Sequence, residues 1–313
     1  MQPAEQQTAT EIQLATRFTT TSSINLRRKC KALTLKASRD DDQGFWRDST
    51  LIGFDIETSG KYPLSSEICE IAAAKWRNGQ IVDEFQTLVR VRVPMGEEVI
   101  AIHHITNEML NGAPSVETAV LDFHKFIADG FLVAHHAPFD MGFLAIEMER
   151  VRLALPKRAV FCSSLLSRKA FSNAPNHRLQ TLIQYFQLIQ GTAHRALDDA
   201  RACLSVALKC FEKVGSDATI ATLLDYQSVP LMWSHYSVAD LRSHAVYGVL
   251  VEALEAHKDV QIIYSGGSRP GVSRTVHPVG LVRNPNGDFF VACDEGDTVS
   301  KRFFLNKITA ARL

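Results

Sequence analysis

The sequence predicts an α/β domain followed by a small all-β domain, and three observations carry that prediction. The chain has 313 residues, 46% of them hydrophobic, so it is long enough to build two cores. In its first two thirds, apolar runs of strand length alternate with apolar residues at helical spacing. From Val260 onward, short β-rich runs lie between turns rich in Gly and Pro, which is typical of a small β-barrel.

Four segments follow from this pattern. Residues 1–45 are rich in Thr, Ser, Gln and Ala and predict a poorly ordered arm, with a nucleic-acid-contacting tail or an organelle transit peptide as alternatives. Residues 46–214 form the predicted α/β domain, residues 215–250 a helical connector, and residues 251–313 the predicted barrel domain.

Charge and cysteine usage narrow the protein's class. Lys+Arg and Asp+Glu are both 34, so a nucleic-acid partner would have to be met by a local basic patch or through metal. The six cysteines are scattered, without a Cys-x-x-Cys pair or an export signal, which favours reduced thiols in a cytoplasmic protein and argues against zinc. No apolar run of about 18 residues predicts a membrane span.

The first strand of the α/β domain ends in two acids. The apolar run 51–54 reads as a buried strand, and Asp55 and Glu57 follow where a core strand would continue. Side chains two residues apart on a strand share a face, so these carboxylates lie side by side. They repel each other unless protons or a cation intervene, and a divalent metal is the natural partner. The alternative is a strand end in solvent, with both acids hydrated.

The next elements are read from local signals. Asn78-Gly79 between two apolar runs predicts a hairpin, so three antiparallel strands open the domain. Ser115 is placed to cap a helix, and 131–134 reads as a further strand. Asp140 follows that strand in the first turn of another helix, where it either complements the helix dipole or joins an active site.

The last acid of interest opens the helix that runs to about residue 213. Helical spacing places Asp198 on a polar stripe and Asp199 on an apolar one, so Asp198 reads as a solvated acid. A lone carboxylate facing the core is costly, so something must compensate Asp199. His194 precedes the helix on a loop, where an imidazole can move and titrate.

These residues match the needs of phosphodiester hydrolysis. The carboxylates of Asp55, Glu57, Asp140 and Asp199 offer oxygen ligands only, which favours two Mg²⁺ or Mn²⁺ ions over zinc. His194 is the side chain able to take a proton from water near neutral pH, so it is the expected general base.

Three segments carry a family resemblance. Phe-Asp-Ile-Glu-Thr-Ser-Gly at 54–60, His-His-Ala-Pro-Phe-Asp at 135–140 and His-Arg-Ala-Leu-Asp-Asp-Ala at 194–200 resemble the motifs of the DEDDh 3′-to-5′ exonucleases. The similarity extends from about residue 51 to 211. It implies a ribonuclease H-like fold, metal-ligand roles for the four acids and the base role for His194. It also implies substrate contacts for Thr58, His136 and Phe139, although His136 stands where the family commonly has Asn.

The C-terminal part resembles a WYL domain, an Sm-like or SH3-like barrel. The matching elements include Ile263-Tyr264, the run 274–278, and Phe289 to Ala292, whereas the naming triplet is degenerate at 288–290. By this resemblance Tyr264, Arg274 and Arg302 would line a pocket for a nucleotide or nucleic-acid ligand; the alternative is that they are surface residues of the barrel.

The resulting prediction is a metal-dependent 3′-to-5′ exonuclease that releases nucleoside 5′-monophosphates, with DNA favoured as substrate and the barrel as a ligand-sensing or strand-binding module. An exoribonuclease that trims RNA is the alternative within the enzyme class. A nucleic-acid-binding regulator with little turnover is the alternative outside it.

Overall fold

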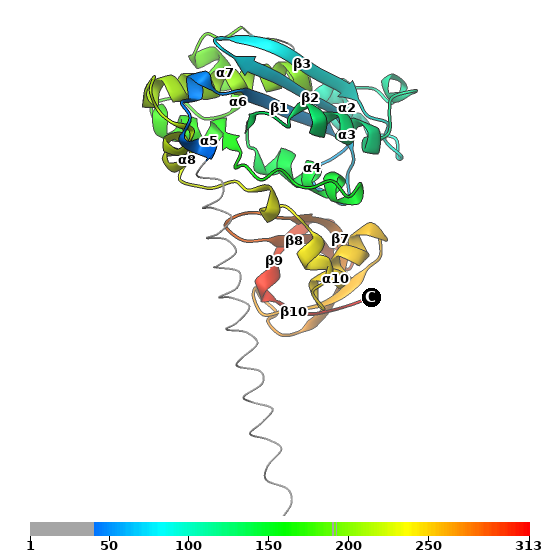
Figure 1. Ribbon diagram of the computed structural model, residues 1–313. Coiled ribbons are helices and arrows are strands. Elements are labelled where there is room, and N and C mark those ends of the chain that lie inside the picture. The colour runs from blue at the N-terminus through cyan, green and yellow to red at the C-terminus, as the bar shows by residue number, and fades with distance from the viewer. Residues whose placement is uncertain (1–40, 190, 192) are drawn as a thin grey trace, which may run out of the picture. The chain divides into compact units, whose positions relative to one another are not determined.

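The computed structural model describes residues 41–189, 191 and 193–313, and Figure 1 shows their elements. Most of the arm predicted for residues 1–45 therefore lies outside the described residues. The chain divides into two compact units, residues 1–44 and 45–313. The described part of the first unit holds a short 3-10 turn, Asp41–Gln43. All the other elements of the described residues belong to the second unit.

The second unit contains a five-stranded mixed sheet (Figure 1) with the strand order β3-β2-β1-β4-β5. Strands β1, β2 and β3 are antiparallel neighbours, whereas β4 runs parallel to β1 and β5 parallel to β4. The strands are β1 (Leu51–Thr58), β2 (Ile68–Arg77), β3 (Gln80–Leu88), β4 (Phe131–Ala134) and β5 (Phe161–Cys162). This mixed sheet with flanking helices confirms the α/β, ribonuclease H-like fold class.

The hairpin between β2 and β3 forms where the sequence predicts it. Asn78 has φ 51° and Gly79 has φ 89°, the positive values that a type I′ turn needs at both central residues. Asn and Gly tolerate these values at low cost, so the turn fixes the register of the two strands.

Helices cover both faces of the mixed sheet. On one face, α3 and α4 pack over Ile52, Phe54 and Ile56 of β1. On the other face, α5, α7 and α8 pack over Leu51 of β1 and Val133 of β4. The helices of this region are α2 (Glu97–His103), α3 (Val116–Phe126), α4 (Pro138–Arg150), α5 (Ser163–Ala170), α6 (Leu179–Tyr185), α7 (Ala196–Val214) and α8 (Ile220–Gln227).

The described part of the second unit also contains four short 3-10 turns. They are η2 (Trp46–Asp48), η3 (Glu108–Leu110), η4 (Trp233–His235) and η5 (Leu305–Lys307).

A second, all-antiparallel sheet follows, with the strand order β10-β6-β7-β8-β9. Its strands are β6 (Val260–Tyr264), β7 (Ser273–Val282), β8 (Phe289–Asp294), β9 (Ser300–Phe304) and β10 (Ile308–Arg312). The last strand that the sequence predicts covers residues 302–305, and β10 lies beyond it. Helices α9 (Ala239–Arg242) and α10 (Tyr247–Glu255) precede the sheet, and α10 packs against β6, β7 and β10.

The second sheet contacts the segment between β1 and β2. The Ser65 hydroxyl donates a hydrogen bond to the Val279 carbonyl oxygen over 2.7 Å. Leu64 is buried in the same apolar cluster as Ile262 and Phe290 of the second sheet. A Cβ atom at Gly280 would come within 2.4 Å of Tyr62, so the backbone of β7 approaches this segment closely. The segment that leaves β1 is therefore held by both sheets.

Two further expectations concern cysteines and membranes. Cys69, Cys162, Cys203, Cys210 and Cys293, the cysteines within the described residues, are free thiols. Among the described helices, none combines the length and the apolar composition that a membrane crossing requires.

Candidate active site

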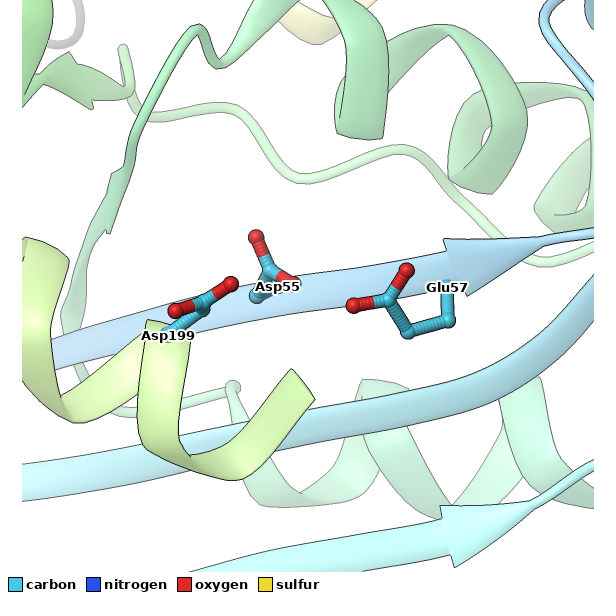
Figure 2. A group of neighbouring side chains, drawn as sticks. All are labelled: Asp55, Glu57 and Asp199. Atoms are coloured by element: carbon cyan, nitrogen blue, oxygen red, sulfur yellow. The ribbon is translucent and has the colours of Figure 1, made fainter. Parts of the chain in front are cut away.

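Three carboxylates meet where β1 passes the first turn of α7 (Figure 2). Asp55 and Glu57 come from β1 and Asp199 from α7, and one oxygen of each lies within 4.8 Å of the other two. Asp199 is 8% exposed, as its place on the apolar stripe of the helix predicts, and the other two are partly exposed. The cluster is thus set into the protein surface but still open to solvent.

Close packing at Gly53 brings the strand and the helix together. A Cβ atom at this position would lie 2.3 Å from the Ala200 carbonyl oxygen and 2.8 Å from the Leu204 Cβ atom. Real Cβ atoms do not make such contacts, so only glycine lets the α7 backbone approach β1 this closely. Because Ala200 follows Asp199, this contact sets the position of the third carboxylate.

Asp140 reaches the cluster through the backbone of β1. It lies in the first turn of α4, which begins at Pro138, and is 2% exposed. Its Oδ1 atom accepts a hydrogen bond from the Ile56 N–H over 3.2 Å, between the two acids of the strand. Asp140 is therefore adjacent to the cluster, although it is not one of the three acids whose oxygens lie within 4.8 Å of one another.

Burial is the main cause that raises the pKa values of the four carboxylates, and neighbouring carboxylates of the cluster add to it for Asp55, Glu57 and Asp140. Burial, followed by the neighbouring charge of Asp140, raises the pKa of Asp55 well above its ordinary value. Burial and then Asp199 raise the pKa of Glu57 to about 8, and burial raises the pKa of Asp140 to about 8. Burial also raises the pKa of Asp199. Without a cation, this cluster retains protons near neutral pH, because full ionisation would leave several negative charges close together.

This donor set suits a hard divalent cation. Within the described part of the chain, no lysine or arginine forms a salt bridge with any of the four carboxylates. A bound cation would displace the retained protons and relieve the repulsion that raises the pKa values. All the donors are carboxylate oxygens, which Mg²⁺ and Mn²⁺ prefer.

His194 lies exposed on the turn before α7, where its backbone adopts a left-handed φ of 59°. Its N–H donates a hydrogen bond to Asp199 Oδ2 over 3.2 Å. This backbone bond fixes the start of the turn to a carboxylate of the cluster and leaves the imidazole free to extend into solvent. The sequence-predicted base is thus held next to the acids.

The three predicted substrate contacts differ in their exposure. The Thr58 side chain is 7% exposed, and its hydroxyl donates to the Gly60 carbonyl oxygen over 2.7 Å. His136 is exposed, and Phe139 is 40% exposed at the start of α4. His136 and Phe139 can therefore meet a ligand directly, whereas the Thr58 hydroxyl already has a partner within the chain.

The three residues predicted for a C-terminal pocket lie on two sides of the second sheet. The Tyr264 ring meets Phe303 edge-on at 5.2 Å, and the Arg274 guanidinium lies 5.9 Å from the centroid of the same ring. Arg302 alternates with Phe303 along β9, so it points to the opposite side and lies 5.1 Å above the Phe289 ring. The structure therefore groups Tyr264 with Arg274 and separates Arg302 from them.

Sequence reasoning missed two features of this site. Gly53 reads only as part of an apolar run, and nothing local shows that α7 packs on it. Glu70 is the other, a fully buried acid on β2 that binds Arg195. An acid inside the apolar run 68–74 is a signal that could have found it, because such a residue needs a partner.

Comparison with protein families identifies an exonuclease domain and a second domain in this chain. The model of the Exonuclease family matches residues 52–207, and the model of the WYL domain matches residues 245–313. Residues 52–207 therefore belong to the Exonuclease family, and residues 245–313 form a WYL domain.

The similarity to individual relatives covers only part of this chain and only part of each relative. DNA polymerase III PolC-type of Halalkalibacterium halodurans is 39% identical over 155 residues, which is 50% of this chain and 11% of the polymerase. A putative bifunctional exonuclease/endonuclease protein of Mycobacterium tuberculosis is 34% identical over 195 residues, which is 59% of this chain and 30% of that protein. The chain thus spans about a tenth to a third of the length of these curated relatives.

Solved structures with weaker similarity are also exonucleases. One is exonuclease X in complex with 5′-overhanging duplex DNA, with 24% identity and a TM-score of 0.44, covering 56% of this chain and 99% of that chain. Another is E. coli exonuclease I in complex with a dA16 oligonucleotide, with 16% identity and a TM-score of 0.49, covering 78% of this chain and 55% of that chain.

Proposed function

We propose that this protein is a metal-dependent 3′-to-5′ exonuclease that releases nucleoside 5′-monophosphates from nucleic-acid 3′ ends. The observation that carries the proposal is the cluster of Asp55, Glu57 and Asp199, with Asp140 bonded to the same strand. Such a group of partly buried acids, which no lysine or arginine of the described residues pairs in a salt bridge, is unfavourable unless a metal ion binds it.

Asp55, Glu57, Asp140 and Asp199 would hold two Mg²⁺ or Mn²⁺ ions. When bound, these metals supply charge stabilisation at a phosphodiester and a nucleophile at neutral pH. The residues themselves fix the place of the reaction, because β1, α4 and α7 each contribute at least one carboxylate. The phosphate nearest the 3′ end would therefore lie over the end of β1.

His194 would act as the general base. Its exposed imidazole stands on the turn that leads to Asp199, so it can accept a proton from the attacking water and release it to solvent. His136 and Phe139, both exposed at the start of α4, would hold the terminal nucleotide, with the Phe139 ring available for stacking on a base. Thr58 would contribute through its backbone, because its hydroxyl is engaged.

We favour single-stranded DNA or a DNA 3′ end as the substrate. The support is the identity to DNA polymerase III PolC-type, which is a DNA-synthesising protein by its name. RNA remains an outcome of the test, because neither His136 nor Phe139 distinguishes a ribose from a deoxyribose by its chemistry alone.

We also propose that the C-terminal module senses a nucleotide or nucleic-acid ligand and influences the exonuclease domain, residues 46–214. Exposed Arg302 above Phe289 offers a cation and an aromatic ring to such a ligand. The contact between Ser65 and Val279 gives the module a route to the segment that follows β1. Because α10 packs on the second sheet, we count this helix with the module and place the connector before it.

The test is hydrolysis of 5′-labelled single-stranded DNA, duplex DNA and RNA with Mg²⁺ or Mn²⁺. We expect stepwise shortening of DNA from the 3′ end, abolished by Asp55→Ala and by Asp199→Ala. Asp198→Ala is the matched control, because this adjacent acid pairs with Arg201 on the outer side of α7 and should leave hydrolysis intact. Full activity of either cluster variant would overturn the metal-ligand assignment. Tight binding of 3′ ends without hydrolysis in either metal would favour a regulator instead.

A further inference from the structure

A fifth acid lies beside the cluster but faces a different set of partners. Glu70 on β2 is 0% exposed and stands directly opposite Glu57 in the antiparallel ladder. A buried carboxylate is costly unless several donors satisfy its oxygens, so the identity of its donors shows what it holds.

Four hydrogen bonds converge on the Glu70 carboxylate. The Arg195 side chain donates to it through Nη2 at 2.8 Å and through Nε at 3.3 Å, a two-point contact. The Ala196 backbone N–H donates over 3.0 Å, and Gln86 Nε2 donates over 2.8 Å. Three of the four donors thus belong to two consecutive residues at the start of α7.

These donors sit between the predicted base and the third metal ligand. Arg195 is the residue before the first turn of α7, and it provides no side-chain cap of its own for that helix. The Glu70 carboxylate supplies the missing acceptor from a neighbouring strand, at the end of the helix where a negative charge is favourable. His194 directly precedes this anchor, and the Asp199 N–H donates to the Arg195 carbonyl oxygen over 3.1 Å.

We infer that Glu70 is a positioning residue, which pins the turn from His194 to Asp199 onto the mixed sheet. The inference rests on the proposed function, because it assigns Glu70 to the alignment of the base and of one metal ligand. Glu70 itself does not touch the reacting atoms. Its salt bridge with Arg195 fixes the residue next to His194, and its bond to Ala196 fixes the helix that carries Asp199.

The pair of Glu84 and Arg201 provides a matched control. It also joins α7 to the sheet through two bonds of 2.6 Å each, but Glu84 lies on β3 and its side chain is 32% exposed. Glu84→Gln therefore removes a similar bridge further along the same helix without touching the turn. Arg201 retains its bond to Asp198 in that variant.

The test compares Glu70→Gln, Arg195→Gln and Glu84→Gln by steady-state kinetics on a labelled oligonucleotide and by hydrogen exchange of the metal-free proteins. We expect Glu70→Gln and Arg195→Gln to lower kcat about 10- to 100-fold, as found for residues that orient metal ligands, with KM changed less than about twofold. Exchange of the amides from 194 to 199 should be about tenfold faster in both. Glu84→Gln should match the wild type in both measurements.

The outcomes separate this inference from the proposed function. Unchanged kcat in Glu70→Gln, or an equal loss in Glu84→Gln, would overturn the positioning role. If Glu70→Gln does not fold, Arg195→Gln decides the question, because the Glu70 carboxylate keeps its bonds to the Ala196 N–H and to Gln86 in that variant. If the wild-type protein hydrolyses none of the substrates, the proposed function fails. The exchange comparison then still shows whether Glu70 holds the turn.

Discussion

Replacing Gly53 by alanine should separate β1 from α7 and disable the site without altering any polar group. In the native packing, the added Cβ atom would lie 2.3 Å from the Ala200 carbonyl oxygen and 2.8 Å from Leu204 Cβ. Ordinary van der Waals contact begins at 3.4 Å. The obstacle on the helix is backbone, which cannot rotate away as a flexible side chain could.

The size of the effect follows from this geometry. To reach ordinary contact, the helix must move away from the strand by about 1 Å, since interiors are too closely packed to absorb the overlap. Overpacking of this kind typically costs about 1–3 kcal/mol of unfolding free energy. Asp199 directly precedes Ala200, so it moves with the helix, and a misplacement of about 1 Å can lower a rate about 100-fold.

The assay is a urea titration together with single-turnover hydrolysis of a labelled oligonucleotide. Gly142→Ala is the control, because a Cβ atom there meets nothing closer than Pro63 Cγ at 3.3 Å, and alanine is the better helix former. We expect the control to retain stability and rate. A Gly53→Ala protein with wild-type stability and rate would refute the claim that this contact positions Asp199.

Three further predictions concern metal binding, the pH dependence of stability and the hydrogen bond of Ser65. Mn²⁺ should stabilise the wild-type protein, by about 2.7 kcal/mol at a hundred times its dissociation constant, and Asp55→Asn should lose that gain in a thermal melt. Because the folded-state pKa of Glu57 is raised to about 8, the native state holds more protons than the unfolded one from about pH 4.5 to 8. Stability of the metal-free protein should therefore fall as pH rises through this window, by up to about 1.4 kcal/mol per pH unit, and urea titrations should show a shallower fall for Glu57→Gln. Ser65→Ala, which removes the bond to Val279, should cost about 1 kcal/mol in the same titrations, and no change would show that this contact is not stabilising.

Local signals account for much of the fold. The alternation in β1, the Asn78-Gly79 turn and the Ser115 cap each depend on neighbours in sequence, and the structure contains all three. The Ser115 hydroxyl, for example, accepts a hydrogen bond from the Thr118 N–H over 3.4 Å. Such features are predictable because their energetics are settled within a few residues.

Features that depend on distant parts of the chain were not predicted. Gly53 is limited by Ala200, and Glu70 is paired with Arg195, more than a hundred residues away in each case. Strand β10 was also missed, because Ile308–Arg312 is short and lies at the edge of the sheet, next to β6. In the site, the sequence indicated which acids belong to the motifs, whereas the packing that brings Asp199 to β1 required the structure.

The contrast between Glu70 and its neighbours is the strongest physical reason to expect a cation at this site. Glu57 and Glu70 lie opposite each other on the adjacent strands β1 and β2. Only for Glu70 does the structure show a bond from the Arg195 guanidinium and one from the first N–H of α7, that of Ala196. Among the described residues, no lysine or arginine forms a salt bridge with Glu57, and burial followed by Asp199 raises its pKa to about 8. A fold that can neutralise one buried acid with Arg195 could have neutralised the next in the same way. The lack of such compensation at the cluster is therefore better explained by a partner from solution, and a divalent cation is the partner that four carboxylates fit.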